Sequence, residues 1–228
     1  MNKIISTVLT MAALLASTTA SAVLIDFEGQ MPGDVVTGLT IDGATFSVTD
    51  QGTTGGNPRD LMIFNSNCGG MLTACTGGDA DLSTTTVPMG VDPISAGNIL
   101  IISQDNNAMN PNDSSAGGTI SMKLNTQATA FSAVTVDVGD SDVGPNFFEA
   151  FLNDVSVGLF LFLAIGQSDN NVQQVGFSDI LFDEIRLTLA GSGGLASVDF
   201  TPVPLPAALP LFMAGLLGLF GLRRKSLA

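Results

Sequence analysis

Short stretches of alternating apolar and polar residues, separated by turn-forming clusters, are the feature that most limits how this chain can fold. In residues 23–28, Val23, Ile25 and Phe27 share one face of a strand, and Asp26 and Glu28 lie on the other. Clusters rich in Gly, Asn and Pro, such as residues 52–58 and 106–115, separate such stretches. The further strand candidates are residues 44–49, 61–64, 99–103, 118–124, 133–138, 147–152, 155–164, 172–177, 184–189 and 195–201.

The body of the chain is therefore predicted to be all-β. Between the two termini no long segment has the periodicity of an amphipathic helix. About ten short strands with frequent turns favour an antiparallel sandwich or a barrel. Residues 23–201 form one candidate domain, and roughly 180 residues are enough to bury a substantial core.

One strand candidate, residues 155–164, is apolar on both faces. Its centre reads Leu159-Phe-Leu-Phe-Leu163. Such a strand is typical of a sheet that is covered on both sides, so we expect a central core strand. The alternative is an exposed apolar face that contacts a partner.

The N-terminus has the order of a secretory signal peptide. Lys3 precedes the apolar residues 4–16, and Ala20 and Ala22 flank Ser21 as a small-residue cleavage site. We expect residues 1–22 to be a helical signal peptide that the Sec machinery recognises, with the mature chain starting at Val23. The apolar run is too short for a stable bilayer span.

The C-terminal residues 202–228 combine prolines, an apolar run and a basic end. Residues 205–222 carry no charge, and Pro206 and Pro210 restrict the start of a helix, which we expect to begin near Pro210. Its length is marginal against the roughly 20 residues of a comfortable span. The basic cluster after the run places the C-terminus in the cytoplasm and the body outside; it consists of Arg223, Arg224 and Lys225. An ordinary membrane anchor and a sorting signal both fit this pattern.

A family resemblance favours the sorting signal. The tail resembles the bacterial PEP-CTERM signal in its VPLPA variant, through the motif Val203, Pro204, Leu205, Pro206 and Ala207. The resemblance implies an exported bacterial protein that passes through an inner-membrane intermediate. An exosortase then cleaves near the motif, and the protein reaches the cell surface or an extracellular matrix of exopolysaccharide or biofilm. The membrane is contacted only through the tail, before processing.

The body also resembles the N-terminal region of many PEP-CTERM proteins. The similarity rests on short segments in a common order, at residues 25–29, 44–48, 77–82, 97–102, 115–120, 190–194 and 198–200. It implies a jelly-roll-like β-sandwich related in architecture to carbohydrate-binding domains.

Charge and composition exclude several classes of function. The chain has a net charge of −14. Outside the two terminal segments only Arg59, Lys123 and Arg186 oppose all 21 acidic residues, which leaves a net charge of −18. Such a body repels nucleic acid and anionic lipid.

The chain contains no histidine, which excludes Ser-His-Asp catalysis, Cys-His catalysis and zinc sites built on imidazole. A carboxylate pair could still cleave sugars, but sugar-cleaving clefts usually stack sugars on aromatic rings, and Phe is the only aromatic residue type present. We predict no enzymatic activity.

Two cysteines, Cys68 and Cys75, flank a short Gly-containing segment. In an exported protein this spacing indicates a disulfide that closes a small loop. A thiol metal site is the alternative, and two cysteines without histidine make a poor one.

Calcium is the cofactor that the acidic residues fit best, because hard cations prefer carboxylate and carbonyl oxygens. In calcium-bearing jelly rolls, an acidic pair on the first strand and an Asp on the last can share one ion; the resemblance assigns these roles to Asp26, Glu28 and Asp199. The alternative clusters are Asp137 with Asp140 and Asp142, and Asp79 with Asp81. Each cluster can also be explained by turn capping or by solvated charge.

These observations favour a non-catalytic exported protein with a structural or adhesive role in the matrix. The second hypothesis is a calcium-dependent carbohydrate-binding module with polysaccharide as its partner. A sugar platform could use Phe147, Phe148 and Phe151, and core packing is the other explanation of these rings.

Overall fold

The computed structural model describes residues 21–49, 53–54, 57–67, 82, 96–138, 144–162 and 171–204. Residues Ala22–Pro202 belong to one compact unit. The regular elements among its described residues are all antiparallel strands, as predicted. They are β1 (Val23–Asp26), β2 (Thr40–Ile41), β3 (Ala44–Thr49), β4 (Thr53–Thr54), β5 (Asn57–Pro58), β6 (Leu61–Asn65), β7 (Asn98–Ile102), β8 (Gly118–Val136), β9 (Phe147–Leu152), β10 (Val155–Leu161), β11 (Val172–Leu189) and β12 (Gly194–Pro202).

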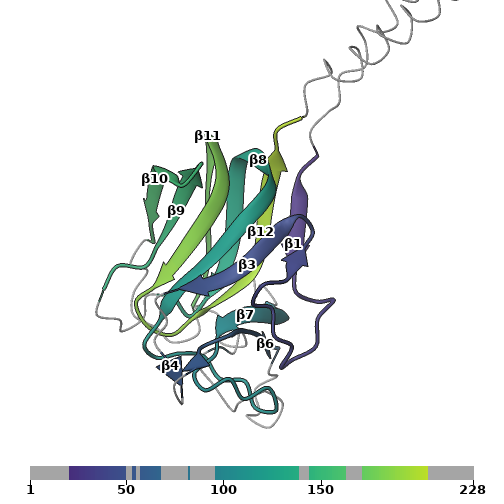
Figure 1. Ribbon diagram of the computed structural model, residues 1–228, viewed down its shortest axis with the longest axis vertical. Helices are drawn as coiled ribbons and strands as arrows, with labels where there is room; N and C mark the ends of the chain where they lie inside the picture. Colours follow the sequence, from purple (N-terminus) through teal and green to yellow (C-terminus); the bar gives the residue numbers. More distant parts are fainter. Residues whose placement is uncertain are drawn as a thin grey trace, which may run out of the picture. The chain divides into compact units, whose positions relative to one another are not determined.

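Two long strands, β8 and β11, run through both layers of a β-sandwich. In the first layer, the first half of β8 lies between β3 and the second half of β11, and β9 and β10 extend the layer beyond β11. In the second layer, the second half of β8 lies between the first half of β11 and β12, with β1, β7 and β6 beyond β12. Figure 1 shows β8 and β11 side by side, and their hydrogen bonds join both layers into one 10-stranded sheet.

The apolar side chains between the layers form the main core. Because successive residues of a strand point to opposite faces, the first half of β8 buries Ile120 and Met122 and turns Ser121 and Lys123 away from the core. Side chains of the two layers meet directly; for example, Phe27 after β1 makes an edge-to-face contact with Phe46 of β3, with ring centroids 5.7 Å apart. The alternation read from the sequence thus positions the core.

A cluster of phenylalanines ties the two halves of the long strands together. Phe131 of β8 lies 5.0 Å from Phe148 of the first layer and 5.4 Å from Phe177 of the second, measured between ring centroids. Phe182, at the bend of β11, makes edge-to-face contacts with both Phe131 and Phe177. Phe160 of β10 stacks on Phe177 at 4.1 Å. Edge-to-face and offset pairs of this kind are favourable beyond the area that they bury.

A second, smaller apolar cluster lies on the other face of β6 and β7. These strands are buried on both faces: Leu61 and Ile63 face the main core, and Met62 and Phe64 face the second cluster. Leu82 is fully buried in this second cluster. The near-continuous apolar sequences of β6 and β7 follow from this double burial.

The two long strands differ from the sequence prediction, which expected separate strands on either side of residues 125–132 and 178–183. The polar residues Asn125, Thr126 and Gln127 are exposed at the bend of β8, but they remain within the strand. Register shifts on either side of Phe182 accommodate the extra residues. Bulges of this kind let a strand bend without ending, so turn-forming composition alone did not mark a turn here.

The prediction for residues 155–164 was wrong within the described part of that segment. Among the described strands β10 pairs with β9 alone, at the edge of the first layer, and Val155, Leu159 and Leu161 are exposed. Phe160, between the exposed Leu159 and Leu161, packs against the core. An apolar sequence on both faces therefore did not require a central strand.

Several expected features lie outside the described residues: the signal peptide through Ala20, both cysteines, and the tail from Leu205 onward, including Arg223, Arg224 and Lys225. Within the part of the chain that the structure does describe, no helix has the length and apolar character of a membrane span.

Replacing Phe131 by alanine is expected to lower the free energy of unfolding by about 3–5 kcal/mol, because the cavity would open among rings of both layers. Phe147→Ala is the matched control, since Phe147 is only half-buried at the start of β9 and should cost clearly less. Chemical denaturation of both variants measures the difference. Equal losses would show that the ring cluster is not the main link between the layers.

Candidate ligand-binding face

The outward side of the first layer carries a polar face built from four neighbouring strands. The pairing registers place Glu149 of β9 opposite Arg186 of β11, Arg186 opposite Ser121 of β8, and Ser121 opposite Ser47 of β3. Two residues further along the same pair of strands, and therefore on the same side, Glu184 lies opposite Lys123. We define the polar face as Ser47, Ser121, Lys123, Glu149, Glu184 and Arg186.

The alternation of the strands explains why these side chains share one side. Arg186 lies between Ile185 and Leu187 in β11, and both of these are buried in the core. A period of two therefore turns Glu184, Arg186 and Thr188 to the opposite side. Thr188 faces Thr119 of β8 across the pair, with their hydroxyl oxygens 3.2 Å apart.

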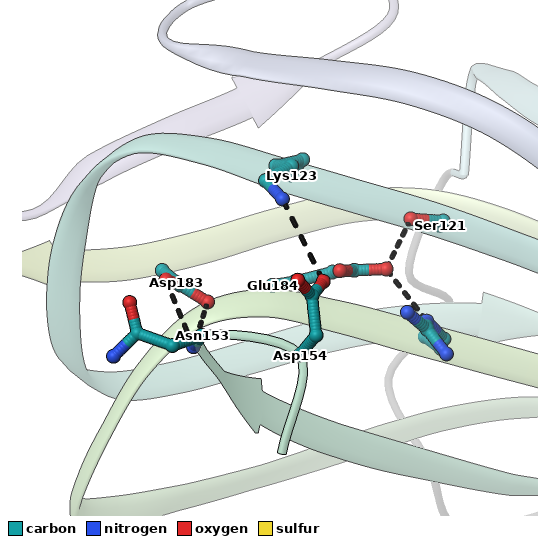
Figure 2. A network of polar contacts seen from close by, with 7 residues as sticks. Ser121, Lys123, Asn153, Asp154, Asp183 and Glu184 are labelled. Carbon is teal, nitrogen blue, oxygen red and sulfur yellow. Dashed lines mark hydrogen bonds and ion pairs between the residues drawn. The ribbon is translucent and has the colours of Figure 1, made fainter. Parts of the chain in front are cut away.

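Glu184 is the centre of the polar face. Its Oε1 accepts hydrogen bonds from Arg186 Nε at 2.6 Å and from Ser121 Oγ at 2.7 Å. The Glu184 residue is only 5% exposed; its bond from Ser121 is buried, and its bond from Arg186 is partly buried. Figure 2 shows Ser121 and Lys123 reaching from one strand toward Glu184 and Asp154. A buried carboxylate of this kind needs its partners, because an unpaired charge would be costly.

Arg186 is also held by an aromatic ring. Its guanidinium carbon lies 3.9 Å from the ring centroid of Phe151 in β9. Stacking on a ring and pairing with a carboxylate suit the planar guanidinium group. The Arg186 side chain is 36% exposed, so part of it remains available to a ligand.

The environment shifts the pKa of both partners. Burial alone would raise the pKa of Glu184, but hydrogen bonds from Arg186 and Ser121, with the charges of Arg186 and Lys123, outweigh it and hold the pKa below its usual value. The hydrogen bond to Glu184 raises the pKa of Arg186 despite its burial, and the charges of Glu184, Asp154 and Glu149 add to the shift. Glu184 is therefore ionised at neutral pH, and it is suited to accept hydrogen bonds rather than to act as a general acid.

A hairpin turn borders the polar face. Asn153 and Asp154 join β9 to β10, and both have positive φ, which is typical of the two-residue turns that suit hairpins. Asp183 of β11 accepts hydrogen bonds from the Asn153 backbone N–H at 3.1 and 3.2 Å. Asp154 lies 3.9 Å from Lys123 Nζ, and both side chains are mostly exposed. An exposed pair of this kind adds little stability.

The three phenylalanines considered as a sugar platform, Phe147, Phe148 and Phe151, differ in their burial. Phe148 is fully buried and belongs to the core, and Phe151 is 8% exposed beneath Arg186. Phe147 alone is half-buried, on the same side as Glu149. The platform hypothesis is thus reduced to Phe147, next to the polar face.

Of the residues expected to bind calcium, Asp26 and Glu28 adjoin each other, because Asp26 Oδ1 accepts a hydrogen bond of 3.2 Å from the Glu28 backbone N–H. Asp26 and Asp199 lie on the outward side of the second layer, where Asp199 faces Leu24 and Asp26 faces Ser197. Glu28 lies beyond β1, and its Oε1 accepts a hydrogen bond of 2.8 Å from the Asn98 backbone N–H at the start of β7. Among the residues that the structure describes, no three Asp, Glu, Cys or His side chains form a metal-holding group.

Of the alternative acidic clusters, only Asp137 is described. It is fully buried, has a φ of 57°, and accepts a hydrogen bond of 3.2 Å from Ser192 Oγ. Asp140, Asp142, Asp79 and Asp81 lie outside the described residues. Within the described residues, Asp137 thus has a structural role directly after β8.

The other predicted sites fall at the margins of the described chain. Ala22 directly precedes β1, and Val203 and Pro204 follow β12 without regular structure. Ala20, Leu205, Pro206, Ala207, Cys68 and Cys75 lie outside the described ranges, so their roles stay predictions.

Comparisons with known proteins add a weak likeness. No protein-family model and no curated protein matches the chain. A family 32 carbohydrate-binding module from a family 31 glycoside hydrolase of Clostridium perfringens is 14% identical, with a TM-score of 0.26, over 40% of this chain and 69% of that one. The family 32 module of C. perfringens NanJ, solved with galactose, is 17% identical, with a TM-score of 0.28; the match covers 80% of this chain and 93% of that one. A glycoside hydrolase is 15% identical, with a TM-score of 0.28; the match covers 50% of this chain and 27% of that one. At these TM-scores the likeness carries no inference about a ligand.

Sequence reasoning missed the polar face, although a signal was present. Two of the three basic residues of the body, Lys123 and Arg186, occupy outward positions of alternating strands. In a body of such acidic composition, basic residues at strand positions indicate specific carboxylate partners. Their pairing across the sheet required the register of β8 and β11, which the sequence does not state.

Replacing Glu184 by Gln is expected to lower the free energy of unfolding by about 1–3 kcal/mol at neutral pH, because Arg186 and Ser121 lose their carboxylate. The folded-state pKa of Glu184 is lowered. The ionised form therefore stabilises the fold above the unfolded pKa of about 4.3, and this contribution is lost as the pH falls through the folded pKa. The difference between wild type and variant should shrink in acid.

Denaturant unfolding from neutral pH to about pH 3 measures this effect. Glu149→Gln is the matched control, since it removes a carboxylate of the same face that makes no hydrogen bond among the described contacts. A stability difference that does not change with pH, or an equal loss in both variants, would contradict the assignment.

Proposed function

We propose that this protein is a non-catalytic exported protein, sorted through its C-terminal tail, with a structural or adhesive role at the cell surface or in an extracellular matrix. The supporting observation is the extent of the folded body. Its compact unit runs from Ala22 to Pro202. The segments left over at either end are those that resemble an export signal and an exosortase sorting signal.

The junctions of the folded body fit this proposal. β1 starts at Val23, the first residue after the expected signal cleavage, and β12 ends at Pro202, immediately before the motif that starts at Val203. Loss of both terminal segments would therefore leave every described strand intact. Under this proposal exosortase and the Sec machinery are transient partners, and the membrane is contacted only before processing.

The proposal predicts an intact mass for the native protein, purified from its own host, that starts at Val23 and ends near Pro204. A double variant, Pro204→Ala with Pro206→Ala, should keep its tail and remain in the membrane fraction. Pro210→Ala changes a proline outside the motif and should be processed normally. A wild-type protein that keeps its C-terminus in the inner membrane would identify the tail as a plain anchor.

A second function, carbohydrate binding, is favoured by the polar face. Its row of carboxylate, guanidinium and hydroxyl groups lies on a rigid sheet, beside the half-buried ring of Phe147. Fixed polar groups of this kind orient sugar hydroxyls, and an aromatic ring supplies an apolar surface. We propose the polar face as the polysaccharide site, and the calcium role of Asp26, Glu28 and Asp199 stays a separate prediction.

The carbohydrate proposal predicts that the host's purified exopolysaccharide retards the protein in a native affinity gel. Glu149→Ala with Phe147→Ala should weaken this binding about tenfold, which corresponds to about 1.4 kcal/mol. Gln174→Ala is the control, because Gln174 is an exposed polar residue of β11 on the second layer. Equal retardation of the three proteins would remove the polar face as the site.

A further inference from the structure

Arg186 is fixed on the polar face by two contacts that use different parts of its guanidinium group. Its Nε donates the hydrogen bond of 2.6 Å to Glu184, and its guanidinium carbon lies over the ring of Phe151, 3.9 Å from the ring centroid. Because Ser121 also donates to Glu184, the arrangement is anchored to β8 as well as to β11. A guanidinium group held in this way loses little conformational freedom when it binds a ligand.

The two terminal nitrogens of Arg186, Nη1 and Nη2, remain outside these contacts. Neither donates a hydrogen bond within the described residues, and Glu149, the residue opposite, makes no ion pair with Arg186 there. In the same part of the chain, Arg59 Nε is the only buried side-chain nitrogen or oxygen that lacks a hydrogen bond, so both Nη groups of Arg186 reach the solvent. The side chain therefore presents two fixed, outward N–H donor groups to a ligand.

A carboxylate is the ligand group that fits these donors best. Its two oxygens accept two N–H bonds in parallel, and a hydrogen bond between charged groups is stronger than one to a neutral hydroxyl. An aromatic ring lies close by: Phe147 of β9 is two residues from Glu149, which is opposite Arg186, so Phe147 and Arg186 are diagonal neighbours. Such neighbours lie about 7–8 Å apart. A uronic acid combines a carboxylate with a sugar ring and therefore fits both side chains.

The charge of the polar face also favours an anionic ligand at this place over the rest of the body. The face contains Lys123 and Arg186, two of the three basic residues of the body, and only two of its 21 acidic residues, Glu149 and Glu184. Its formal charge is therefore zero, and the rest of the body keeps the whole net charge of −18. An acidic polymer that the body repels elsewhere meets less repulsion here.

We propose that the polar face binds polysaccharides that contain uronic acid, and that Arg186 selects them by binding the sugar carboxylate through its two Nη groups. Glu149 then accepts a hydrogen bond from a hydroxyl group of the same polymer, and Phe147 contacts the apolar face of a sugar ring. The inference rests on the carbohydrate-binding proposal above; it adds the class of sugar and the residue that selects it.

Chemical reduction of the polymer's carboxylates to primary alcohols tests the proposal without altering the protein. The probes are alginate, polygalacturonate and the host's exopolysaccharide, each in its native and its reduced form, in a native affinity gel. Reduction should weaken binding about tenfold. Salt at about 0.15 M, where the Debye length is about 8 Å, screens the acidic residues outside the polar face. Binding that reduction leaves unchanged would overturn this inference alone, whereas no binding to any polymer would remove the carbohydrate proposal with it.

The variant Arg186→Lys tests the role of the guanidinium group, because lysine keeps the positive charge beside Glu184 and lacks the two Nη donors. It should bind the native uronate polymer about tenfold more weakly than wild type, and the reduced polymer equally well. Arg59→Lys is the matched control: Arg59 lies before β6, donates to Ser114 and is outside the polar face, so this variant should bind like wild type. Thermal unfolding confirms that both variants are folded. Full affinity of Arg186→Lys for the uronate polymer, or an equal loss for both forms of it, would contradict the role of Arg186.

Discussion

The contacts of Phe131, Phe148, Phe177 and Phe182 are the interaction on which the rest of this structure depends. β8 and β11 each belong to both layers, and a bent strand holds its bend only if side chains on both sides of it are fixed. The phenylalanine rings meet at this place, with centroids between 5.0 and 6.4 Å apart. Rings from both halves of the two strands thereby set how the layers pack, and through them the positions of the remaining strands.

The polar face follows from the same two strands. Once Ile185 and Leu187 are buried, Glu184 and Arg186 must lie on the outward side, and the register with β8 brings Ser121 and Lys123 beside them. The hydrogen bonds of Glu184 then keep the outward groups in fixed positions. A sheet surface with fixed donors and acceptors is a suitable platform for a hydroxyl-rich ligand, which is why the second functional proposal rests on it.

The alternation of short segments was sufficient to predict the all-β class, most strand positions and the antiparallel sandwich, because burial on one face imposes a period of two. It was insufficient where a strand bends, since Asn125–Gln127 have turn-like composition yet stay within β8. It also misplaced β10, because an apolar sequence does not distinguish a covered strand from an open edge. The Glu184 pairings depend on cross-strand register, which is set by bulges that the pattern of one strand does not reveal.

The pairing of β1 with β12 has a consequence for the order of folding. Val23 faces Phe200 and Ile25 faces Val198, so the first strand of the body completes its layer only against the last. A chain that crosses a membrane from its N-terminus exposes β1 long before its partner emerges, and contacts so distant in sequence form slowly. Under the export and sorting scheme proposed above, the body would therefore stay unfinished at this edge until translocation is almost complete, when the C-terminal tail is the only part still held by the membrane. Maturation of the sheet and arrival of the tail then coincide in time.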